Sequence, residues 1–126
     1  MRYTLLMHYP EVSPEELGDE VMEAGRQAMS SYAATLQAAG VLIGAEVLQP
    51  SDATTTLRKV DGALRIQDGP FADTKEQFGG SFVIDVPDLD AALDWAGRAP
   101  GLDWEGAIEV RPGATHTVDG MWMPNV

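Results

Sequence analysis

The chain contains no cysteine, and this absence excludes three kinds of chemistry. Disulfide bonds, thiolate catalysis and cysteine-bound zinc all require a sulfhydryl group. A chain without cysteine also agrees with a reducing compartment, where disulfides do not form. We therefore expect a cytoplasmic protein.

Basic residues are scarce as well. Eight Lys and Arg stand against twenty Asp and Glu, which gives a formal net charge of -12. A chain this acidic repels the phosphate backbone of nucleic acids and the headgroups of anionic lipids. Neither a nucleic acid nor a membrane is therefore expected as a partner, and acids such as Glu15 and Glu16 are expected to cover a solvated helix surface.

The residues that usually hold metals and nucleotides are also few. His8 and His116 are the only histidines, and they are far apart in the sequence, without the short spacing of a metal-binding motif. Glycine-rich nucleotide-binding loops and the serine-hydrolase motif are missing too. We expect no bound metal and no cofactor.

Long apolar runs are absent. A membrane-spanning helix needs about eighteen or more consecutive apolar residues, and no segment approaches this. The N-terminus does not resemble a leader, because His8 and Pro10 interrupt the short apolar stretch after Arg2. With 126 residues and 44% hydrophobic residues, the chain is expected to form one soluble domain.

The first half of the chain shows a strand, a helix and a second strand. Residues 2–9 alternate between two faces, which is the period of a strand. Ser13-Pro14-Glu15-Glu16 has the form of a capping box, and an apolar stripe follows it, so a helix is expected from Pro14 to about Ala39. Residues 41–48 are β-branched and apolar, which predicts another strand.

The second half adds a hairpin, a strand, a helix and a last strand. Asp61-Gly62 separates residues 54–60 from residues 63–67 and predicts a hairpin with a type I′ turn. We expect this hairpin to extend the edge of the main sheet. The remaining elements are a strand at 81–86, a helix from Asp88 to about Gly97 and a strand at 106–111.

Without the hairpin, these elements follow the order βαββαβ. This order predicts an α+β fold of the ferredoxin-like type, with an antiparallel sheet and both helices on one face. The other face, with Leu6 and Val83, would be bare, so we predict a homodimer whose sheets pack face to face and leave a pocket at the edge. The domain is expected to span residues 1–112, followed by a C-terminal tail at 113–126. Met121-Trp122-Met123 in this tail would pack on the partner or on the chain's own domain.

The segment from Gln67 to Gly80 is the most unusual one, because it combines a tight turn with charged, aromatic and glycine residues. In the predicted sheet, the end of the first strand places His8 near the exit of this segment. Asp68 and His8 would form a carboxylate–imidazole pair suited to proton transfer. Alternatively, Asp68 only caps its own Asp-Gly-Pro turn.

Several residues of this segment are candidates for ligand binding. Gly69 and Pro70 stiffen the turn and present Phe71, which would either wall a pocket or plug the core. Lys75 would hold an anionic ligand or be an ordinary surface charge. Gly80, with Gly79, would expose backbone N–H donors to an oxyanion or simply permit a bulge.

Two further candidates come from other elements. Tyr32, on the apolar stripe of the first helix, would either reach the pocket rim or pack in the core with its hydroxyl satisfied. Arg111 would be the clamp for a carboxylate, or it would form an ion pair with Glu109 or Asp85.

The motif Asp68-Gly69-Pro70-Phe71, with Thr74-Lys75-Glu76-Gln77, Gly79-Gly80 and the run at 83–92, resembles the DGPF-domain branch of the YCII-related proteins over about residues 1–112. The resemblance implies a dimeric ferredoxin-like fold and a pocket at Asp68 to Phe71, Lys75 and Gly80. Relatives in the wider group are proposed to use a His–Asp dyad with the histidine on the first helix. Residues 26–31 contain no histidine here, so His8 would have to take that role.

Two functions follow as hypotheses. In the first, a small dimer catalyses a cofactor-free acid/base step on a small carboxylate, with Asp68 as base or orienter, His8 as acid/base and Lys75 or Arg111 as anion holder. In the second, the protein is a non-enzymatic ligand-binding or regulatory module; some members of the resembling family are similar to partners of sigma factors. An enzyme needs a titrating group in a pocket, whereas a module needs only shape.

Overall fold

The computed structural model describes all residues of the chain, 1–126. Its helices are α1 (Pro14–Leu17), α2 (Asp19–Ala38) and α3 (Leu89–Ala96), with 3-10 turns η1 (Ser51–Ala53) and η2 (Pro100–Trp104). Its strands are β1 (Arg2–Pro10), β2 (Leu42–Val47), β3 (Thr55–Val60), β4 (Ala63–Asp68), β5 (Glu76–Asp85), β6 (Ala107–Pro112), β7 (Thr115–Val118) and β8 (Met121–Pro124). None of the helices combines the length and the hydropathy that a membrane crossing requires.

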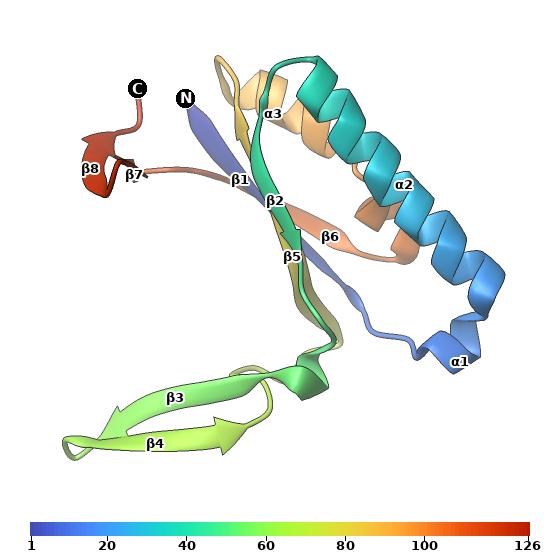
Figure 1. Cartoon of the computed structure of the whole chain (residues 1–126), viewed down its shortest axis with the longest axis vertical. Coiled ribbons are helices and arrows are strands. Elements are labelled where there is room, and N and C mark those ends of the chain that lie inside the picture. Colours follow the sequence, from blue (N-terminus) through green and yellow to red (C-terminus); the bar gives the residue numbers. More distant parts are fainter.

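Four strands form the main sheet in the order β2-β5-β1-β6, and every neighbouring pair is antiparallel. The helices α2 and α3 lie on the same side of this sheet, as Figure 1 shows. This arrangement confirms the predicted ferredoxin-like α+β fold. We call the side of the main sheet away from α2 and α3 the open face.

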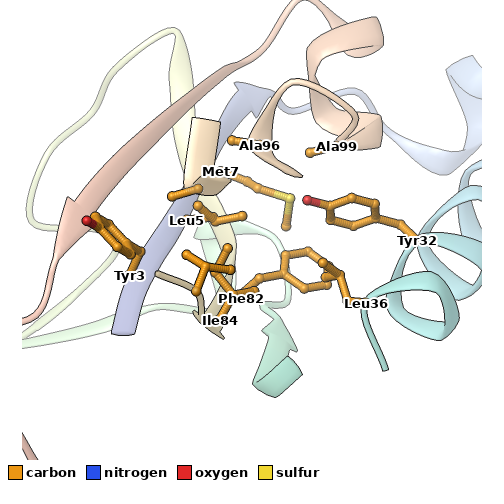
Figure 2. Packing of buried hydrophobic residues seen from close by; sticks show 11 residues of the cluster. Tyr3, Leu5, Met7, Tyr32, Leu36, Phe82, Ile84, Ala96 and Ala99 are labelled. Carbon is orange, nitrogen blue, oxygen red and sulfur yellow. The ribbon is translucent and has the colours of Figure 1, made fainter. Parts of the chain in front are cut away.

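The core lies between the sheet and the helices. Alternate residues of β1 point into it, and they meet residues of β5 and α2 there (Figure 2). Its largest fully buried side chains are Phe82, Leu5, Met7, Leu36 and Ile84. The period-2 pattern of β1 therefore assigns one face to the core and leaves Thr4, Leu6 and His8 on the open face.

The predicted single helix is divided in two. Gly18 separates α1 from α2 with a φ of 83°, a left-handed conformation that glycine adopts at little cost. The start of α1 is as expected, because the Ser13 hydroxyl accepts a hydrogen bond from the Glu16 backbone N–H at 3.2 Å. The prediction of one continuous helix was wrong at Gly18, a weak point of the expected helix, whereas the other weak point, Gly25, stays inside α2.

The predicted hairpin is present, with Asp61 and Gly62 at φ angles of 51° and 78° as a type I′ turn requires. It does not extend the main sheet, however: β3 and β4 form a separate two-stranded sheet that projects from the domain (Figure 1). The 3-10 turn η1 redirects the chain before β3, and Glu11 holds this turn. Its carboxylate accepts hydrogen bonds from the Ser51 backbone N–H, at 2.6 Å, and from the Ser51 hydroxyl.

The C-terminal tail forms a second hairpin from β7 and β8, which sequence reasoning missed. Asn125 ties this hairpin to the start of β1. Its side-chain amide donates to the carbonyls of Arg2, at 3.0 Å, and Gly113, at 2.7 Å, and its side-chain oxygen accepts from the Arg2 backbone N–H at 2.7 Å. The tail is therefore docked on its own domain, while Trp122 remains 72% exposed.

Replacing Asn125 by alanine is expected to loosen the tail without unfolding the domain. The change removes the bonds that the Arg2 N–H and the Gly113 carbonyl make with Asn125, while the Arg2 carbonyl keeps its bond from the Gly113 N–H, at a cost of roughly 1–3 kcal/mol. Hydrogen exchange of the β7 and β8 amides should accelerate by roughly 5- to 150-fold. Val126→Ala is the control, since Val126 is 97% exposed. Unchanged exchange in the Asn125 variant would show that the tail is held in another way.

Candidate functional site

His8 and Glu109 meet on the open face. Antiparallel pairing places Leu6 opposite Glu109 and His8 opposite Ala107, so both side chains project from the same side of neighbouring strands. The His8 Nε2 atom lies 2.6 Å from Glu109 Oε1. A carboxylate–imidazole pair is thus present, but its carboxylate comes from β6 and was not among the expected partners of His8.

The immediate surroundings of His8 are partly apolar. Its ring centroid lies 5.6 Å from that of Phe78, with the planes tilted by 48°. Nε2 is buried and lacks an aligned hydrogen bond, even though the Glu109 oxygen is close. The contact is therefore ionic when the imidazole is protonated, and a small rotation of either side chain would align it as a hydrogen bond.

Asp68 ends β4, opposite Thr55, and its side chain is exposed and makes no hydrogen bond or ion pair. The turn after it is held by threonines instead. The Gly69 N–H donates to the Thr54 carbonyl at 2.8 Å, and the Thr56 hydroxyl donates to the Gly69 carbonyl at 2.7 Å. Gly69 has a φ of 100°, a conformation that favours glycine over other residues at this position. In the single chain, Asp68 therefore neither caps this turn nor contacts His8.

The other residues of the turn lie at the surface. Pro70 is half-buried, while Phe71 is 72% exposed and lies under the guanidinium of Arg58, 4.6 Å from the ring centroid. The alternative in which Phe71 plugs the core is therefore wrong for the single chain. Lys75 is exposed and forms no ion pair.

Gly79 and Gly80 are buried inside β5, which begins at Glu76 and is longer than predicted. The register of β5 against β1 shifts between Met7 and His8, which marks a bulge at these glycines. A Cβ at Gly80 would lie 2.5 Å from the Glu46 carbonyl oxygen. Close backbone packing therefore explains why glycine is needed at this position.

Tyr32 belongs to the core on the helix side of the sheet. Its ring meets Phe82 edge-on at 5.0 Å, and its hydroxyl donates to the Trp95 carbonyl at 2.8 Å. Burial raises the pKa of Tyr32 to about 12, and the nearby Arg98 opposes this only in part. The structure thus separates Tyr32 from His8, which lies on the opposite side of the sheet.

Arg111 lies on the open face of β6, two residues beyond Glu109 and opposite Thr4. It is exposed and pairs with neither of its two expected partners. Glu109 contacts His8, and Asp85 accepts a hydrogen bond from the N-terminal amino group at 2.7 Å. This hydrogen bond lowers the pKa of Asp85. Arg111 is therefore an unpaired cation near the His8–Glu109 pair.

The open face is hollowed beside β1. A depression of about 320 Å³ is lined by Gly44, Ala45, Glu46, Ser81 and Val83. It lies on the open face because Ser81 and Val83 alternate with the core residues Phe82 and Ile84. A second depression of about 350 Å³ lies on the helix side, near Tyr32 and Trp95. Both volumes are at the low end for small-molecule sites.

The structure contains no cluster of three or more His, Asp or Glu side chains that would suit a metal ion. Around His8, the open face offers one imidazole, its carboxylate neighbour Glu109 and the free guanidinium of Arg111, while the carboxylate of Glu46 lines the depression. Sequence reasoning placed Glu109 and Arg111 on one side of the last strand, but it did not pair Glu109 with His8. The strand register decides that pairing, and β1 and β6 are not joined by a short turn that would fix it from the sequence.

The family model of the YCII-related domain matches residues 1–112. The chain is also similar to an uncharacterised protein of Rhizobium meliloti (strain 1021), with 35% identity over 113 residues, which cover 89% of this chain and 91% of the relative. On both grounds, the protein belongs to the YCII-related domain family.

Proposed function

We propose that the protein is a homodimer that binds a small carboxylate between its two open faces and transfers a proton on it without a cofactor. The observation that carries this proposal is the 2.6 Å contact between His8 Nε2 and Glu109 Oε1. A histidine beside a carboxylate is a common arrangement in acid/base catalysis. The lack of cysteine agrees with a cytoplasmic location.

The exposed apolar surface supports the dimer. Only 15 of 126 residues are buried in the single chain. Leu6 and Val83 project from the open face, because their neighbours in β1 and β5 fill the core. A second copy that packs face to face on this sheet would remove these side chains from water and would enclose the depression at Ser81.

The proposed chemistry assigns one task to each group. His8 takes a proton from a carbon or oxygen of the ligand and returns it to a neighbouring atom, so the proton balance closes within the site. Glu109 stabilises the imidazolium that forms meanwhile, as the acid of a catalytic triad does. Arg111 holds the carboxylate of the ligand. Asp68 and Lys75, which end and follow the β3–β4 hairpin, remain candidates for contacts made across the dimer.

The proposal is tested with a panel of small carboxylates, screened by thermal shift and then by solvent proton exchange into the ligand that binds. His8→Gln should abolish exchange. Glu109→Gln should slow it by at least tenfold, because the contact with Glu109 orients the His8 imidazole. Arg111→Gln should raise KM more than it lowers kcat. The matched control is His116→Gln, which removes the other histidine.

Equal exchange rates in the wild type and in His8→Gln would disprove the catalytic assignment. Ligand binding without any exchange would favour the second candidate, a non-enzymatic ligand-binding or regulatory module. One observation favours that candidate: the side chains of Asp68 and Lys75 make no ion pair in the single chain, so the turn before β5 serves there as structure rather than as a second catalytic group.

A further inference from the structure

We propose that the β3–β4 hairpin is an arm that docks on the acidic surface of a second copy of the chain. The inference rests on the homodimer of the proposed function and specifies how the two copies hold each other. The arm, residues 55–68, projects from the main sheet on the side away from α2 and α3 (Figure 1). An isolated two-stranded hairpin is at best marginally stable in water, so an arm of this kind needs a surface to cover it.

One face of the arm carries three large aliphatic side chains beside Lys59. Cross-strand pairing places Leu57 opposite Ile66 and Lys59 opposite Leu64, and directly opposed residues share a face. Leu57, Leu64 and Ile66 are 58%, 57% and 68% exposed. Three large aliphatic side chains on one exposed face of a short hairpin are typical of an interface rather than of a solvated surface.

The other face carries two arginines in direct opposition. Arg58 pairs with Arg65 across the ladder, and like charges in this position destabilise a hairpin. Neither guanidinium forms a salt bridge, although the chain has twenty acidic residues. Phe71 lies 4.6 Å from the Arg58 guanidinium and restricts its position. The pair is thus cationic and without a counter-ion inside its own chain.

The charge distribution favours a second copy as the occupant. Residues 55–68 contain three basic and two acidic residues, a formal charge of +1. The rest of the chain has five basic and eighteen acidic residues, a formal charge of -13. The arm is therefore a weakly cationic segment on a strongly acidic chain, and it would attract the acidic body of another copy. Arginine pairs recognise carboxylates in two-pronged hydrogen bonds, which adds direction to this attraction.

The base of the arm is held at a defined angle. Glu11 binds both the backbone and the hydroxyl of Ser51 before β3, and the Gly69 N–H donates to Thr54 after β4. The turn at Asp68 to Phe71 stands at this base. A docked arm would therefore hold that turn at the boundary between the copies, so each copy contributes it to the site that the two open faces enclose.

Sedimentation velocity of the full chain tests the proposal, with the dissociation constant measured at low and high salt. Ile66→Asp should weaken the dimer by at least tenfold. The double variant Arg58→Glu with Arg65→Glu should weaken it severalfold at low salt and abolish its salt dependence. Arg26→Glu is the matched charge reversal on α2, where Arg26 pairs only with Glu23, and should leave the dimer unchanged. Circular dichroism confirms that each variant is folded.

Val83→Asp, on the open face, distinguishes the face-to-face dimer from the docking of the arm. If it dissociates the dimer while both arm variants dimerise like the wild type, the arm proposal is overturned and the face-to-face dimer stands. A wild type that stays monomeric at all concentrations overturns both and means that something other than a second copy covers the arm.

A cross-linking experiment uses the lack of native cysteine. Leu64→Cys, labelled with a photoreactive benzophenone, is mixed with isotope-labelled copies and illuminated. Cross-links from the arm to an acidic segment of the other isotope support docking between copies. Cross-links confined to one copy contradict it, whatever the oligomeric state.

Discussion

Phe82→Ala is expected to lower the free energy of unfolding by about 3–5 kcal/mol, a large share of the stability of a domain this size. Phe82 is 2% exposed and lies in the middle of β5, where its ring meets Tyr32 edge-on at 5.0 Å. Truncation removes the apolar surface that this ring buries and leaves a cavity between the sheet and α2. The surrounding strands are paired on both sides of β5, so they cannot close the cavity.

Urea unfolding followed by circular dichroism measures this effect, at one fixed protein concentration because dimerisation would contribute to stability. Phe71→Ala is the matched control, since it makes the same chemical change at a side chain that is 72% exposed. Its effect should stay below about 1 kcal/mol, including the contact with Arg58. If the two variants lost equal stability, the assignment of the core to the helix side of the sheet would be wrong.

Stability at alkaline pH is the second large effect. Burial raises the pKa of Tyr32 from 10.0 to about 12, so the folded chain keeps this proton where the unfolded chain loses it. The unfolded state binds fewer protons over this interval, and stability must fall as the pH rises. The contribution of Tyr32 is complete below pH 10 and is lost as the pH rises through about 12. The loss is at most roughly 3 kcal/mol.

Urea midpoints between pH 9 and 12 measure this slope, and Tyr32→Phe should flatten it. The same variant should be about 1 kcal/mol less stable at neutral pH, because the Trp95 carbonyl loses the donor that lies at 2.8 Å. Tyr9→Phe is the comparison: burial raises the pKa of Tyr9 as well, with Glu11 adding to it, so part of the slope should remain there. If Tyr32→Phe had the same slope as the wild type, the Tyr32 hydroxyl of the wild type would not be protected from solvent base.

Local patterns in the sequence predicted most of the elements. The alternation in residues 2–9, the N-cap at Ser13 and the Asp61-Gly62 turn each depend on neighbours in the chain, and each is present in the structure. Local information was misleading where two elements had to be placed relative to each other. The hairpin was expected on the edge of the sheet, but Glu11 and Ser51, forty residues apart, turn it outward.

The candidate site shows the same division. His8 was correctly placed on the strand between β5 and β6, near the start of β5. Its carboxylate partner was expected in the Asp-Gly-Pro turn because that motif is conspicuous in the sequence. Glu109 takes this position instead, since the pairing of β1 with β6 places Glu109 opposite Leu6, two residues from His8 and on the same face.

By itself, the amino-acid sequence determined the fold class, the βαββαβ order of the main elements and the face of the first strand that enters the core. These depend on periodicity, capping and turn chemistry, which act over a few residues. Only the tertiary structure decided that Glu109 meets His8, that Asn125 binds the tail to β1 and that the arm stands apart with its arginines unpaired. The physical reason is that these contacts join residues far apart in the chain: the hydrophobic pattern fixes which face of a strand is buried, but β1 and β6 share no short turn that would fix which residues stand opposite each other.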